Sequence, residues 1–318
     1  MIDALLLLAG IALLLKGADF LVQGASGLAS RFGISQLVIG LTIVSFGTSM
    51  PEVLVTMLSG LRGHPDLAIG NILGSNIANI LLVLGIAAII RPLPVHDSTV
   101  VSEIPFSLTA ALLVGFLANA ALFSSYPELS ISHVDGVVLL FFFFLFGLYI
   151  YNIARTRSIS PELPESGLGV ARPVIMVLAG VFGLFLGGHW VVGAAISLAE
   201  ALNISDSLIG LTVVAIGTSL PELTASGVAA YRNQTDIAVG NVVGSNIFNL
   251  LWVLGITSMV TELPFEVVSN MDLVMVIASS SLLLLALVSS RTNTVLRGHG
   301  VIFVLAYVAY LVYLVNRG

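Results

Sequence analysis

The sequence predicts an all-α integral membrane protein with ten transmembrane helices in two inverted five-helix repeats. Three observations favour this fold class: an apolar composition, an internal repeat and an uneven distribution of arginines. Of the 318 residues, 58% are hydrophobic and 9% are charged, and the mean hydropathy is +1.10. Soluble domains carry about 25% charged residues, so this composition indicates a chain that lies in a bilayer.

Ten apolar runs are each long enough for a helix to cross the ~30 Å hydrocarbon core of a membrane. The alternating pattern of barrel strands is absent from the sequence, which favours a helical bundle. The first run is placed like a signal peptide, but it carries Lys16 and Asp19 in its middle, so we assign it as a span. The predicted spans are residues 4–30, 36–61, 67–91, 97–122, 133–153, 172–200, 206–231, 236–261, 269–290 and 297–315.

The internal repeat is the strongest signal in the chain. Residues 40–85 align without a gap with residues 210–255, and 23 of the 46 aligned positions are identical. The identical positions include Thr, Ser, Pro, Glu and Asn, which are not common filler of membrane helices. A carboxylate inside an apolar segment is costly and marks a functional site. Two copies of one polar motif therefore predict one site built from two halves.

The most polar connector, residues 155–169, separates the ten spans into two groups of five. We therefore expect a first five-helix repeat at residues 1–154, a cytoplasmic linker at 155–171 and a second repeat at 172–318. Because five is an odd number, the second repeat must be inverted relative to the first.

Arginine placement is consistent with the inversion. If the N-terminus lies outside, eight arginines fall on inner loops and two on the outer face. This bias predicts a multi-pass protein of the cell (inner) membrane with both termini on the non-cytoplasmic side. Inverted repeats are typical of secondary transporters, whose site lies near the bilayer midplane where the repeats meet. The inner arginines are Arg31, Arg91, Arg155, Arg157, Arg172, Arg232, Arg291 and Arg297; the outer ones are Arg62 and Arg317.

A Gly-Thr-Ser-x-Pro-Glu hexad interrupts one helix in each half, at residues 47–52 and 217–222. Proline lacks an N–H, so we expect the carbonyls of residues 45–48 and 215–218 to lose helical partners. Freed carbonyls persist in a membrane only where they line a cavity or find other partners. Together with hydroxyl and carboxylate oxygens they form a site for a hard cation such as Ca²⁺ or Na⁺. The side chains concerned are Thr48, Ser49, Glu52, Thr218, Ser219 and Glu222.

The next span of each half carries Gly-Asn-x-x-Gly-Ser-Asn-Ile-x-Asn, at residues 70–79 and 240–249. Its serine and last asparagine are four apart and share a helix face, so these pairs are predicted to supply neutral ligand oxygens. The pairs are Ser75 with Asn79 and Ser245 with Asn249. For the other asparagines, Asn71, Asn76, Asn241 and Asn246, interhelical hydrogen bonding is the favoured role over ligation.

Other polar residues have more ordinary interpretations. Asp66 and Asp236 precede apolar runs and are predicted helix N-caps. Asp19 is spaced to pair with Lys16 on one helix, or to serve a gate. Glu103 is placed to contact a neighbouring helix. His189 is interpreted as a buried, hydrogen-bonded histidine, with a proton relay as the alternative.

Composition excludes several classes of protein. There is no cysteine, hence no disulfide and no thiolate metal site. No basic run suggests nucleic acid. No HExxH motif and no serine–histidine pairing is visible, so we expect a transporter and not an enzyme, with no cofactor. The expected partners are Ca²⁺ and Na⁺ ions and the lipid bilayer, with no obligatory protein partner evident.

The hexads GTSMPE and GTSLPE, each followed by GSNIxN, resemble the paired repeats of the cation/calcium exchanger superfamily, most closely its bacterial and archaeal sodium/calcium exchangers. The resemblance implies a Ca²⁺/Na⁺ antiporter that works by alternating access, with Glu52 and Glu222 as the principal ligands. It also implies that the first span of each half slides across the core. The implied metal site comprises Glu52, Glu222, Thr48, Ser49, Thr218, Ser219, Ser75, Asn79, Ser245 and Asn249, with backbone carbonyls of Ser45 and Ala215.

One position departs from the family pattern. Many members have an aspartate where this chain has Asn249, which leaves two carboxylates and argues against K⁺ cotransport. Three alternatives stay open at this point: Ca²⁺/H⁺ exchange, Na⁺/H⁺ exchange on the same fold, and a cation channel.

Overall fold

The computed structural model describes residues 2–123, 129–156, 170–201, 215–290 and 292–317, which are largely helical. The first half contains α1 (Ile2–Phe32), α2 (Gln36–Ile39), η1 (Gly40–Val44), α3 (Ser45–Thr48), α4 (Met50–Leu61), α5 (Pro65–Ala78), η2 (Asn79–Leu84), α6 (Gly85–Ile90), α7 (Asp97–Val101), α8 (Glu103–Ala118), η3 (Ala120–Phe123) and α9 (His133–Thr156). The second half contains α10 (Ala171–Ala201), α12 (Ala215–Thr218), α13 (Leu220–Tyr231), α14 (Thr235–Ile247), η5 (Phe248–Val253), α15 (Leu254–Val260), α16 (Ser269–Ser289) and α17 (Arg297–Arg317).

Eight of the described helices are long and apolar enough to cross a membrane. A ninth span forms if the pair 36–48 and 50–61, bent by 48°, counts as one. The remaining predicted span, 206–231, begins outside the described residues and continues in α12 and α13. The most buried windows belong to α5–α6 at 78% and α14–α15 at 94%, against 17% for α9. The two motif-bearing segments therefore lie at the centre of the bundle.

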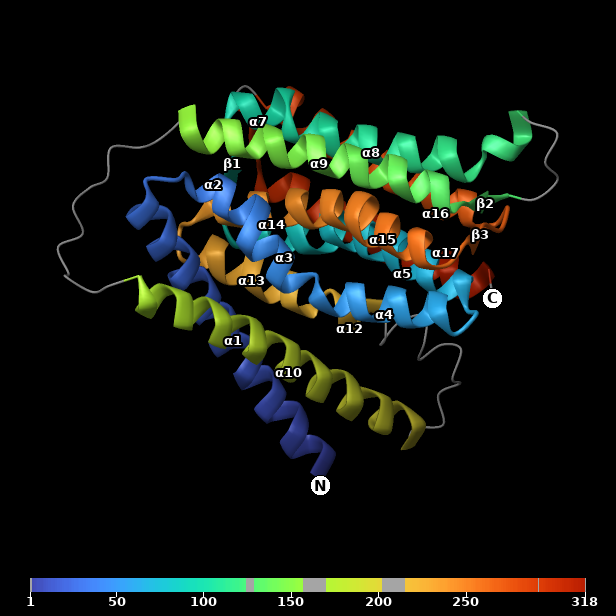
Figure 1. Cartoon of the computed structure of the whole chain (residues 1–318). Coiled ribbons are helices and arrows are strands. Elements are labelled where there is room, and N and C mark those ends of the chain that lie inside the picture. Colours follow the sequence, from blue (N-terminus) through green and yellow to red (C-terminus); the bar gives the residue numbers. More distant parts are fainter. Residues whose placement is uncertain (1, 124–128, 157–169, 202–214, 291, 318) are drawn as a thin grey trace.

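Helices α1 and α10 cross each other on one side of the remaining helices (Figure 1) and run in opposite directions. Glycines allow their backbones to touch. A Cβ added at Gly17 would lie 2.8 Å from the Leu184 nitrogen, and one added at Gly180 would lie 2.5 Å from the Leu21 nitrogen. Only glycine permits this approach, as in other small-residue helix contacts in membranes.

Two short antiparallel strand pairs link the halves of the chain. Strand β1 (Leu93–Pro94) pairs with β4 (Thr294–Val295), and β2 (Ser130–Ile131) pairs with β3 (Leu263–Pro264). The strand after α6 thus pairs with a segment of the second half, and its equivalent after α15 pairs with a segment of the first. This reciprocal exchange ties the two halves into one unit.

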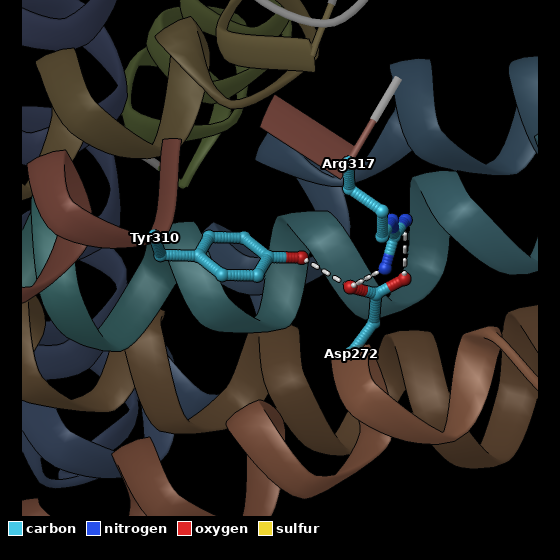
Figure 2. A network of polar contacts seen from close by, with 3 residues as sticks. All are labelled: Asp272, Tyr310 and Arg317. Carbon is cyan, nitrogen blue, oxygen red and sulfur yellow. Dashed lines mark hydrogen bonds and ion pairs between the residues drawn. The ribbon is translucent and has the colours of Figure 1, made fainter. Parts of the chain in front are cut away.

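Acidic residues at the starts of α8 and α16 anchor the last helix of each half. Asp272 accepts hydrogen bonds from Tyr310 at 2.9 Å and from both terminal nitrogens of Arg317 at 2.9 and 3.1 Å (Figure 2). Bidentate pairs of this kind fix geometry as well as charge. In the first half, Glu103 accepts a hydrogen bond of 2.9 Å from Tyr149 on α9. The predicted contact of Glu103 with a neighbouring helix is therefore present.

Candidate cation site

Two carboxylates occupy the centre of the bundle. Glu52 and Glu222 lie in the first turns of α4 and α13, and both are fully buried. Ser49, three residues before Glu52, reaches the Glu222 carboxylate, so the two acids belong to one place in the bundle. One oxygen of each is hydrogen-bonded, Glu52 by Ser75 at 3.4 Å and Glu222 by Ser49 at 2.8 Å. Within the described residues the Oε2 atom of each has no partner, an arrangement that favours a bound cation because a buried charge requires compensation.

The helix breaks place these acids. Helix α3 ends at Thr48 and α4 begins at Met50, and Ser49 between them has φ −82° and ψ 10°. Ser219 has nearly the same conformation, φ −86° and ψ 4°. Each proline follows its break in the first turn of the new helix, where a missing N–H is tolerated. Each glutamate comes next, near the positive end of a helix dipole.

The expected loss of helical partners by the backbone carbonyls is wrong for Ser45. Its carbonyl accepts a hydrogen bond of 3.0 Å from the Ser49 N–H and one of 3.4 Å from the Thr48 hydroxyl. The missing N–H of Pro51 affects the carbonyl four residues earlier, at Gly47, and not that of Ser45. In the second half Ala215 begins α12, and the Ser219 N–H bonds to the Ile216 carbonyl at 3.1 Å. The structure does not describe the side chain of Ala215.

Two buried asparagines of the motifs lie at π-helical turns. Asn79 opens η2 and Asn249 lies in η5, and both are buried. π-Helical turns occur often at functional sites. Asn79 donates from Nδ2 to Asn246 Oδ1 at 3.0 Å, which leaves its own Oδ1 without a partner. For Asn249, neither side-chain polar atom has a partner in the described part of the chain.

Most of the buried polar atoms without a partner among the described residues belong to the motif residues predicted as ligands. Besides the two Oε2 atoms and the asparagine amides, the hydroxyls of Ser219 and Ser245 are buried without a partner among the described residues. Buried polar atoms are nearly always hydrogen-bonded, so several unpaired oxygens together indicate a site for a ligand. Among the described residues no cluster of three His, Asp or Glu side chains exists. Neutral oxygens must therefore complete any shell around the two carboxylates.

The threonines of the hexads bond across the halves. Thr48 donates to Asn241 Oδ1 at 3.1 Å, and Thr218 donates to Asn71 Oδ1 at 3.5 Å. Asn76, by contrast, donates to the Ile72 carbonyl within its own helix at 2.7 Å. The interhelical role predicted for the motif asparagines is present for Asn71, Asn241 and Asn246.

The prediction of two helix N-caps is wrong. Asp66 and Asp236 are not N-caps; they lie one residue inside α5 and α14, whose caps are His64 and Gln234. These helices begin at Pro65 and Thr235, which is two positions and one position before the predicted spans 67–91 and 236–261.

Asp19 and His189 also have other surroundings than predicted. In the described part of the chain the ion pair of Asp19 is with Arg232 at the end of α13, not with Lys16. Asp19 also accepts a hydrogen bond of 2.9 Å from Gln23. His189 is exposed, not buried, and lines a cavity of about 280 Å³ together with Thr218.

Sequence reasoning missed the hydroxyls of Thr56 and Ser226. Each lies four residues after a site glutamate and accepts a hydrogen bond of 3.0 Å from Asn71 or Asn241. The repeat alignment contains the signal, because the two positions are equivalent and both hold a hydroxyl.

Comparison with known proteins gives consistent matches over nearly the whole chain. The family model described as sodium/calcium exchanger protein matches residues 2–152 and 172–316. The chain is 41% identical over 268 residues to the inner membrane protein YrbG of Escherichia coli, covering 80% of this chain and 79% of the relative. It is 35% identical to the putative antiporter CaxA of Alkalimonas amylolytica, covering 98% of each. A solved structure of the sodium-calcium exchanger NCX_Mj, soaked with 2.5 mM Na⁺ and 0.1 mM Ca²⁺, matches with a TM-score of 0.81 and 33% identity over 98% of each chain.

Proposed function

This chain belongs to the sodium/calcium exchanger protein family, and we propose that it is an antiporter that exchanges Ca²⁺ for Na⁺ by alternating access. The observation that carries the proposal is the pair of buried carboxylates, Glu52 and Glu222, with unpaired oxygens from both halves around them. Carboxylate, hydroxyl and amide oxygens suit Ca²⁺, which takes six to eight oxygen ligands. Na⁺ accepts the same hard ligands, so one shell can serve both ions in turn.

The proposed site consists mainly of residues from the two polar motifs of each half. Glu52 and Glu222 are the charged ligands. The carbonyl of Ser45 keeps a helical hydrogen bond, but a carbonyl oxygen has a second lone pair for a cation. The neutral ligands are Thr48, Ser49, Ser75, Asn79, Thr218, Ser219, Ser245 and Asn249, with the backbone carbonyls of Ser45 and Ala215.

Repulsion between the two carboxylates explains why the movement of one ion is coupled to that of the other. Two carboxylates ~6 Å apart at an effective dielectric of about 20 repel each other by about 3 kcal/mol. An empty site is therefore unfavourable to enclose in protein. One Ca²⁺, or two or more Na⁺, neutralises the pair. A loaded carrier can then change sides while an empty one cannot, and this produces exchange instead of leak.

The proposed architecture has ten transmembrane helices in two inverted repeats, residues 1–154 and 172–318, joined by a cytoplasmic linker at 155–171. The antiparallel α1 and α10 and the reciprocal strand pairs support the inversion. Both termini would lie on the non-cytoplasmic side. The α1–α10 pair is the element proposed to slide across the core, because it packs along one side of the other helices (Figure 1).

The test is uptake of ⁴⁵Ca²⁺ into proteoliposomes under an outward Na⁺ gradient. We expect uptake by the wild type, loss of uptake for Glu222→Gln, and normal uptake for Asp66→Asn, an acid exposed at the start of α5. Full uptake by Glu222→Gln would exclude the assigned site. Uptake driven by a pH gradient without Na⁺ would instead identify a proton-coupled exchanger. Flux that needs no counter-ion on the far side would identify a channel.

A further inference from the structure

Two asparagines beside the proposed site, Asn71 and Asn241, have no place among its ligands. Each is the second residue of the Gly-Asn-x-x-Gly-Ser-Asn motif, on α5 or α14. Asn241 is fully buried and Asn71 is half-buried. Both side-chain ends of each amide are hydrogen-bonded, in contrast to Asn249, whose ends are both unpaired.

The hydrogen bonds form the same relay twice. In one relay, Thr48 donates to Asn241 Oδ1 at 3.1 Å, and Asn241 Nδ2 donates to the Ser226 hydroxyl at 3.0 Å. The threonine comes from the first half, and the asparagine and serine come from the second.

The second relay is the first with the halves exchanged. Thr218 donates to Asn71 Oδ1 at 3.5 Å, and Asn71 Nδ2 donates to the Thr56 hydroxyl at 3.0 Å. Asn71 Nδ2 also lies 3.4 Å from the backbone carbonyl of Glu52. Both copies of the repeat keep this three-residue arrangement, although the last position is threonine in one copy and serine in the other, and this indicates a common physical purpose.

The purpose follows from the chemistry of a hydroxyl. A threonine hydroxyl has one proton to donate and two lone pairs. A cation binds the lone pairs and repels the proton, so the proton must point at an acceptor elsewhere. The Thr48 hydroxyl also lies 3.4 Å from the Ser45 carbonyl, which is a proposed ligand, and a proton directed there would oppose a cation on that oxygen. The amide oxygen of Asn241 provides the other acceptor.

The last member of each relay sets the direction of the amide. An asparagine amide presents an oxygen on one side and an NH₂ on the other. Because Nδ2 of Asn241 donates to Ser226, its oxygen faces Thr48. Without the hydroxyl of Ser226, the amide could turn its NH₂ toward the threonine, and Thr48 would then keep only its longer contact of 3.4 Å with the Ser45 carbonyl.

We propose that Asn71 and Asn241 are positioning residues: each holds the hydroxyl of the opposite half's threonine with its lone pairs toward the transported cation. They act through Thr218 and Thr48 and do not contact the ion. Thr56 and Ser226 hold the two amides in turn. This inference rests on the proposed cation site.

The test measures equilibrium binding of ⁴⁵Ca²⁺ to the purified full chain in detergent. Loss of groups that orient metal ligands lowers metal affinity by about 10–100-fold, and we expect that loss for Asn241→Leu. We expect Ser226→Ala to lower affinity in the same direction, and Ser226→Thr to rescue it, because threonine fills the equivalent position 56. The control is Asn119→Leu, which removes one amide of the reciprocal Asn119–Asn270 pair between α8 and α16.

A double-mutant comparison separates positioning from a general loss of structure. If Asn241 acts through Thr48, adding Asn241→Leu to Thr48→Val should change affinity by less than about twofold, since the hydroxyl to be oriented is already absent. The same 10-fold or greater loss in both backgrounds would overturn the proposal. If Asn241→Leu does not fold, wild-type affinity in Ser226→Ala would overturn it equally.

The outcomes also separate this inference from the proposed function. Absence of saturable Ca²⁺ binding by the wild type would refute the cation site itself. Binding that Glu222→Gln abolishes but Asn241→Leu and Ser226→Ala leave intact would refute only the relay.

Discussion

The hydroxyl of Ser49, at the helix break of the first half, donates a 2.8 Å hydrogen bond to the Glu222 carboxylate of the second half. The equivalent bond in the other direction is not made: Ser219 Oγ has no partner in the described part of the chain. Glu52 instead accepts a longer bond of 3.4 Å from Ser75, within its own half. The two acids therefore occupy different surroundings despite the repeated sequence.

Replacing each of these serines by alanine should have unequal effects on the ion-free protein. Ser49→Ala removes a hydrogen bond to a buried carboxylate and should lower the free energy of unfolding by about 1 kcal/mol. Ser219→Ala removes an unpaired hydroxyl and should leave that stability unchanged. Thermal unfolding in detergent without Ca²⁺ or Na⁺ measures both. Equal melting temperatures for the two variants would show that the asymmetry does not exist in solution.

The repeat made much of this fold predictable. Eight of the ten predicted spans coincide with membrane-length helices among the described residues, and a ninth coincides with the bent pair 36–48 and 50–61, because helix length and hydropathy are set locally by the bilayer. The repeat also predicted that Glu52 and Glu222 belong to one site, because two copies of a motif with a carboxylate inside the membrane are expected to serve the same purpose. What sequence could not give was the direction of individual hydrogen bonds. Ser49 and Ser219 are equivalent in sequence, and only packing decides that one of them reaches an acid.

The errors have physical causes of the same kind. Lys16 is three residues from Asp19, but Arg232 arrives from another helix and forms the ion pair instead. Local spacing shows which partners are within reach and says nothing of partners from distant helices. The hydroxyls of Thr56 and Ser226 accept from asparagines of another helix, whereas hydroxyls within helices usually bond their own backbone, so sequence alone does not predict these partners.

Asn249→Asp should slow the transport of Ca²⁺. The variant adds a third carboxylate to a site in which one Ca²⁺ neutralises two, so the loaded carrier keeps an uncompensated buried charge. Each 1.4 kcal/mol of that cost slows movement about tenfold, and buried unpaired charges cost several kcal/mol. We expect a lower turnover of ⁴⁵Ca²⁺/Ca²⁺ exchange with Ca²⁺ affinity equal to or above that of the wild type. Asn119→Asp, outside the proposed ligand set and paired with Asn270 in the wild type, is the control. Wild-type turnover for Asn249→Asp would contradict the charge rule.

Gly180→Ala should force α1 and α10 apart. The added methyl group would lie 2.5 Å from the Leu21 backbone nitrogen, too close for any side-chain adjustment to relieve. Overpacking of this kind costs about 1–3 kcal/mol, which should lower the melting temperature and the rate of Ca²⁺ uptake. Gly193→Ala on the same helix meets nothing within 4 Å and is the matched control. If both variants behave alike, direct backbone contact is not what holds this pair together.

Asp19→Asn should loosen the contact between α1 and α13. The Asp19–Arg232 ion pair joins the helix proposed to slide to the end of a core helix, beside a cavity of about 400 Å³ lined by Leu15, Val228 and Tyr231. Both side chains are partly exposed, so the loss of stability should stay below about 1 kcal/mol. The position of α1 relative to the core should respond more, because the pair must break whenever α1 moves past α13.

The chain contains no cysteine, so one introduced thiol reports this motion without background. We expect a membrane-impermeant thiol reagent to label Val228→Cys at least several-fold faster when Asp19→Asn is also present. Val301→Cys controls for general loosening of the bundle, because Val301 is exposed on α17 and does not line this cavity. Equal acceleration at both positions would mean that the substitution destabilises the fold as a whole. No acceleration at position 228 would mean that the ion pair does not restrain α1.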